Sequence, residues 1–106
     1  MDIADATGKL VKYYILNGNK IEKDSFIGMY KDVIKYLYSD YFDILFSPEM
    51  KEIVNISREK SDFITPIEIE SGYYVERQLS ADRIVNKLKK IAEMREDILD
   101  LRVCFK

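Results

Sequence analysis

The chain has 106 residues and a formal net charge of −2, with 47% hydrophobic and 34% charged residues. This composition is typical of one globular domain and excludes a disordered chain or a membrane span, because charges interrupt every apolar stretch. The sequence contains no histidine and one cysteine, Cys104, which excludes histidine-based catalysis, a histidine-ligated zinc ion and an internal disulfide.

The first residues differ in composition from the rest of the chain. Residues 1–8 are mostly small or acidic, and we interpret them as a flexible lead-in or the remnant of a linker. The remaining residues, 9–106, are then expected to form a single α+β domain. Because the N-terminus lacks the basic start and apolar run of a signal peptide, we expect a cytoplasmic protein with no membrane association.

The domain begins with a predicted β-hairpin. Residues 9–16 are rich in β-branched and aromatic side chains, which favour a strand. Asn17-Gly18 follows and is a strong turn signal, because both residues tolerate a positive φ. A short return strand is therefore expected over 19–22.

A long helix is predicted next. Apolar residues over 26–45, Phe42 included, recur at steps of three and four and form one apolar stripe. Asp24 or Ser25 can cap its N-terminus. A pause in the helix is expected at Ser39-Asp40.

The second half of the chain shows signals for a short helix, two strands, a long helix and a last strand, over 48–54, 67–70, 73–76, 81–95 and 99–105. Ser47 and Ser80 are the expected caps of the two helices. Ser71-Gly72 is the expected turn between the first two of these strands.

These elements predict an α+β fold in ββαα-ββαβ order. A right-handed crossover through the last helix would place strand 99–105 parallel to strand 73–76, while the other strands can pair antiparallel. We therefore predict a mixed, mostly antiparallel sheet of about five strands, with two main helices packed mainly on one face.

Possible catalytic patterns are weak. Asp62, Glu68 and Glu70 are carboxylates of the kind that hold Mg²⁺ in nucleases, but the usual lysine is missing and a solvated strand face explains them better. Residues 57–60 match the S-x-x-K pattern of penicillin-recognising enzymes, without its partner motifs. We predict no catalytic residue, no metal site and no cofactor.

Two residue groups are candidates for binding. Arg83, Lys87 and Lys90 stand one helical turn apart and form a basic stripe that can contact nucleic-acid phosphates, although a solvated helix face is the simpler interpretation. The chain also has eight tyrosines. The pairs Tyr13-Tyr14 and Tyr73-Tyr74 lie on predicted strands, so one member of each should face outward and could form a protein interface or a base-stacking platform.

Several stretches resemble one family: NGNKI at 17–21, the helix that runs to Leu37-Tyr38, SGYYVE at 71–76, LSA at 79–81 and IVNKLKKI at 84–91. Together they look like a small α+β accessory domain of bacterial restriction- or defence-associated proteins. The resemblance spans about residues 9–105 and implies a module attached to, or related to, a longer protein. It implies no defined catalytic residues.

We therefore expect a non-catalytic accessory or protein-interaction domain. Its partner would be another protein, an adjacent domain or a second copy of the chain. One alternative is a nucleic-acid-associated module that uses the basic stripe. A second alternative is a small metal-dependent nuclease that uses Asp62, Glu68 and Glu70.

Overall fold

A computed structural model describes residues 10–23 and 25–106. The chain divides into two compact units, which we call the terminal unit (Met1–Tyr30 with Ser80–Lys106) and the central unit (Lys31–Leu79). The predicted lead-in over 1–8 and the candidate cap Asp24 lie outside the described residues. A single domain over 9–106 stays a prediction.

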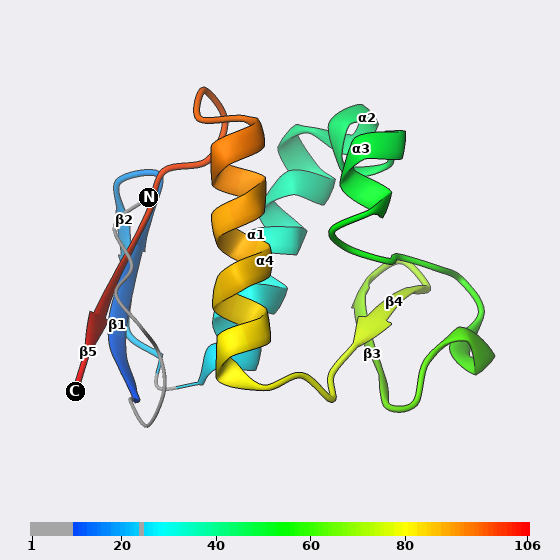
Figure 1. Ribbon diagram of the computed structural model, residues 1–106, viewed down its shortest axis with the longest axis horizontal. Coiled ribbons are helices and arrows are strands. Elements are labelled where there is room, and N and C mark those ends of the chain that lie inside the picture. Colours follow the sequence, from blue (N-terminus) through cyan, green and yellow to red (C-terminus); the bar gives the residue numbers. More distant parts are fainter. Residues whose placement is uncertain (1–9, 24) are drawn as a thin grey trace. The chain divides into compact units, whose positions relative to one another are not determined.

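The terminal unit contains a three-stranded sheet in the order β2-β1-β5, which joins the two ends of the chain (Figure 1). Its strands are β1 (Val11–Leu16), β2 (Asn19–Ile21) and β5 (Leu101–Phe105), and both pairings are antiparallel. Asn17 and Gly18 have φ values of 48° and 86°, so the predicted hairpin turn is confirmed.

A register shift in β1 explains which of its residues face the core. Val11 pairs with Phe105 and Tyr13 pairs with Cys104, so Lys12 is an extra residue between two consecutive pairs. This bulge allows Val11 and Tyr14 to be buried together although they stand an odd number of residues apart.

Helix α4 (Ala81–Met94) completes the terminal unit. The Ser80 Oγ accepts a hydrogen bond from the Arg83 N–H at 3.2 Å, which confirms the predicted cap. The predicted inward residues of this helix are all buried: Ile84, Val85, Leu88, Ile91 and Ala92.

Helix α1 (Phe26–Asp40) begins where Ser25 Oγ accepts a hydrogen bond from the Gly28 N–H at 3.1 Å. The helix ends at the predicted pause, because Tyr41 leaves helical geometry with φ −139° and ψ 51°. A single turn, α2 (Phe42–Leu45), follows it.

The central unit continues with α3 (Pro48–Lys51), the 3-10 turn η1 (Lys60–Asp62), and the two-stranded antiparallel sheet of β3 (Pro66–Glu70) and β4 (Tyr73–Glu76). Ser47 Oγ accepts a hydrogen bond from the Met50 N–H at 3.3 Å, as predicted for a cap.

The core of the central unit is formed by its buried apolar residues, which are Val33, Ile34, Leu37, Leu45, Met50, Val54, Ile69 and Val75. None of the helices in the described chain is long and apolar enough to cross a membrane.

The predicted α+β class and the five strands are confirmed, but the predicted single mixed sheet is wrong. The strands form two sheets, and β5 pairs antiparallel with β1 instead of parallel with β4. Two hydrogen bonds of the Asn17 side chain favour this pairing, just before β5 begins. Its Nδ2 donates to the Ile98 carbonyl at 3.1 Å, and its Oδ1 accepts from the Asp100 N–H at 2.7 Å.

Candidate functional site

The predicted basic stripe lies on one helix of the terminal unit. Arg83 and Lys90 are exposed on α4, and Lys87 between them is half-buried. Burial lowers the pKa of Lys87, and the nearby charges of Arg83 and Lys90 lower it further. The three cations are therefore close enough to influence one another electrostatically.

The tyrosine pair on β1 divides between the core and the surface. Tyr14 is completely buried, so its side chain does not reach the surface. Tyr13 is half-buried, and the Lys20 Nζ lies 4.4 Å from the centre of its ring. Tyr14 is therefore not part of a binding surface.

The tyrosine pair on β4 contacts basic side chains of the segment between α3 and β3. The Arg58 guanidinium lies 4.2 Å from the centre of the Tyr73 ring, and the Lys60 Nζ lies 5.3 Å from that of Tyr74. Both tyrosines are half-buried. A cation stacked on each ring leaves these side chains held in place at the surface.

Tyr73 belongs to a larger group, which we call the aromatic cluster: Tyr38, Phe42, Phe46 and Tyr73. The Tyr38 ring centre lies 5.3 Å from that of Phe42 and 5.7 Å from that of Tyr73. The Phe46 ring centre lies 4.6 Å from that of Phe42 and 5.1 Å from that of Tyr73. The four rings thus form a closed ring of contacts within the central unit.

Phe42 is 44% exposed, although the sequence pattern predicts it on an apolar stripe facing the core. That expectation is wrong because the helix stops at Tyr41, so the α2 turn no longer follows the helical phase of α1. The four-residue spacing of Tyr38 to Phe42 and of Phe42 to Phe46 is compatible with these two ring contacts. Nothing in the sequence indicates that Arg58 stacks on the same group.

A shallow hollow of about 450 Å³ lies beside the cluster, at the break between α1 and α2. Its lining residues are Ser39, Asp40, Tyr41, Phe42, Asp43 and Ile44. Asp40 and Asp43 are exposed, and neither carboxylate makes a hydrogen bond or ion pair within residues 10–23 and 25–106. Phe42 therefore belongs both to the cluster and to an acidic hollow.

The predicted nuclease carboxylates do not form a metal site. No group of three or more acidic or cysteine side chains that could hold a metal ion occurs in the described part of the chain. Asp62 instead accepts a hydrogen bond from the Ser57 Oγ at 2.5 Å, while Glu68 and Glu70 are exposed on β3. The Ser57 Oγ also accepts a hydrogen bond from the Glu59 N–H at 3.0 Å, just before the 3-10 turn η1.

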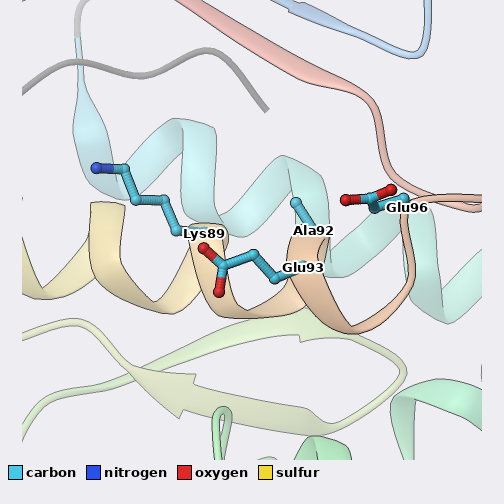
Figure 2. Close-up of a pocket in the computed structure, with 4 residues that line it drawn as sticks. All are labelled: Lys89, Ala92, Glu93 and Glu96. Atoms are coloured by element: carbon cyan, nitrogen blue, oxygen red, sulfur yellow. The ribbon is translucent and has the colours of Figure 1, made fainter.

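Another hollow lies on the terminal unit, lined by Lys89, Ala92, Glu93 and Glu96. Figure 2 shows that the charged ends of Lys89, Glu93 and Glu96 point in different directions and do not meet at one position. A ligand there would meet no converging set of polar groups, so this hollow is the weaker candidate site.

Comparison with protein-family models, with curated proteins and with solved structures finds no match for this chain. The resemblance to accessory domains of restriction- or defence-associated proteins therefore stays a prediction.

Proposed function

We propose that this chain is a non-catalytic protein-interaction module that binds its partner through the aromatic cluster. The observation that carries the proposal is the exposed Phe42 ring, which packs on Tyr38 and Phe46. Phe46 in turn contacts Tyr73, on whose ring the Arg58 guanidinium stacks. A cytoplasmic location and an adjacent domain or second protein as partner belong to the same proposal.

Physical chemistry favours such a surface for protein binding. Interfaces are enriched in aromatic residues and arginine, and a few of these residues carry most of the binding energy. Phe42 is held by its ring contacts, so it loses little conformational entropy when a partner covers it. Tyr73 and Arg58 add a rigid, partly polar rim, which orients a partner as well as binding it.

A photo-cross-linking experiment tests this proposal. The photoreactive analogue benzoylphenylalanine replaces Phe42 in one protein and the exposed Glu52 in a matched control, and both are irradiated in native cell extract. We expect a discrete adduct from position 42 that the control lacks. An adduct that Tyr73→Ala or Arg58→Ala abolishes strengthens the assignment. The absence of any adduct specific to position 42 would overturn it.

A second candidate function is nucleic-acid association through Arg83, Lys87 and Lys90. It is favoured by the exposure of Arg83 and Lys90, which stand about one turn before and one turn after Lys87 on α4 and can reach phosphates. A gel-shift assay at low salt with DNA and RNA tests it. Replacing the three residues with Gln should abolish the shift, while the same change at the exposed Lys12, Lys51 and Lys106 should not. A shift that is lost equally in both triple variants, or is absent from wild type, contradicts it.

A further inference from the structure

We propose that the hollow between α1 and α2 binds a lysine or arginine side chain from a basic segment of the partner protein. This inference rests on the proposed function and names the chemistry of the partner at the same surface. It is carried by the Ser39–Ile44 hollow, where carboxylates and exposed aromatic atoms occur together.

The end of α1 gives the hollow a negative electrostatic potential. A helix carries partial negative charge at its C-terminus, where a basic residue is normally stabilising. The last turn of α1 contains no basic residue, and it ends instead in Asp40. Asp43 adds a second carboxylate one turn later. A bound cation would offset all three sources of negative charge at once.

Aromatic rings line the same hollow. Tyr41 is held by an edge contact with Tyr36, with ring centres 5.8 Å apart, and Phe42 is held by the aromatic cluster. A lysine or arginine combines an apolar stem with a charged end, so the stem can cover Phe42 while the charge approaches a carboxylate or a ring face. A purely acidic patch would bind any cation. The aromatic rings favour a cation that also carries an apolar chain, as lysine and arginine do.

The charge of the surrounding unit agrees with this partner. Residues 31–79 contain ten acidic and six basic residues, a net charge of −4. A basic segment would therefore be attracted toward the whole unit before it reaches the hollow. Acidic peptides and nucleic acids would be repelled from it.

A fluorescence-anisotropy titration tests the inference with a defined probe, a short labelled peptide in which Arg and Leu alternate. We expect saturable binding to the full chain, and no binding of a twin peptide in which Gln replaces Arg. Asp40→Asn with Asp43→Asn should weaken binding about tenfold, as expected for the loss of two exposed ion pairs. Phe42→Ala should weaken it to a similar extent, with folding checked by circular dichroism.

The matched control is Glu68→Gln with Glu70→Gln, which makes the same charge change on β3 of the same unit. This control should bind within about twofold of wild type, because neither glutamate lines the hollow and salt screens exposed charges. Equal loss in both double variants, or none in the hollow variant, overturns the inference. If the Arg peptide does not bind but the Phe42 cross-link persists, the partner has another chemistry and the proposed function stands.

Discussion

At the scale of single residues, Glu76 fixes the loop before β3. Its carboxylate accepts hydrogen bonds from the backbone N–H groups of Ile64 at 2.7 Å, Thr65 at 3.0 Å and Gln78 at 2.9 Å. These bonds, the Gln78 bond foremost, lower the pKa of Glu76. Because the folded pKa lies below the unfolded one, the stabilisation is present at neutral pH and is lost as the pH falls through the folded pKa.

We expect Glu76→Gln to destabilise the protein at pH 7, since a neutral amide forms weaker bonds with the three N–H groups. The difference from wild type should shrink below about pH 4, where the unfolded carboxyl is protonated. Urea denaturation at both pH values measures this, with the exposed Glu68→Gln as control. Hydrogen exchange should also speed up at Ile64 and Thr65. An unchanged difference at low pH would contradict the assignment.

Asn17 links the hairpin turn to the segment before β5, more than eighty residues along the chain. Asn17→Gly keeps the positive φ but removes both side-chain hydrogen bonds, which should cost about 2 kcal/mol. Asn17→Ala should cost about 1 kcal/mol more, because alanine is strained at φ 48°. Chemical denaturation compares the two variants. Equal stability of the two would show that backbone strain at residue 17 is unimportant.

At the scale of elements, the caps set where the helices begin. Ser80→Ala removes the hydrogen bond to the Arg83 N–H and should destabilise the protein by about 1 kcal/mol. Ser80→Asp should retain most of that stability, because aspartate is also a good cap and favours a helix N-terminus. Denaturation midpoints measure the effect, with the exposed Ser61→Ala as the neutral control. A loss in Ser80→Asp equal to that in Ser80→Ala would rule out the capping role.

Most helices, strands and turns were predictable, because their sequence signals lie within a few residues of the element. Features that depend on contacts between distant parts of the chain were not predictable. Asn17-Gly18 and Ser80 act on neighbouring residues, so the sequence reveals the turn and the cap directly. The bulge at Lys12 depends on the pairing of β1 with a strand at the other end of the chain, which no local pattern indicates. The β1–β2 hairpin of the terminal sheet was therefore predictable, but the pairing of β1 with β5 was not.

The candidate site follows the same rule. The sequence indicates that tyrosines gather at the surface, and Tyr73 does lie in the aromatic cluster. It does not indicate the exposure of Phe42, which depends on the conformation of one residue, Tyr41. It also does not indicate the stack of Arg58 on Tyr73, because that contact joins an irregular segment to a strand.

At the scale of the whole molecule, we expect Tyr30 to limit stability at high pH. It is 2% exposed, and burial raises its pKa far above the usual value of a tyrosine. Above about pH 10 the unfolded chain loses this proton while the folded chain keeps it. The free energy of unfolding should then fall by about 1.4 kcal/mol per pH unit on account of this one residue.

Tyr30→Phe removes that proton, so its stability should decline less steeply than that of wild type between about pH 10 and pH 11.5. Urea denaturation across this range, together with tyrosinate absorbance, measures both the stability and the ionisation. In wild type, Tyr30 should ionise only as the protein unfolds. Tyr13→Phe is the control, because its ring lies half-buried at the surface. Parallel pH profiles for wild type and Tyr30→Phe would show that another group sets the alkaline limit.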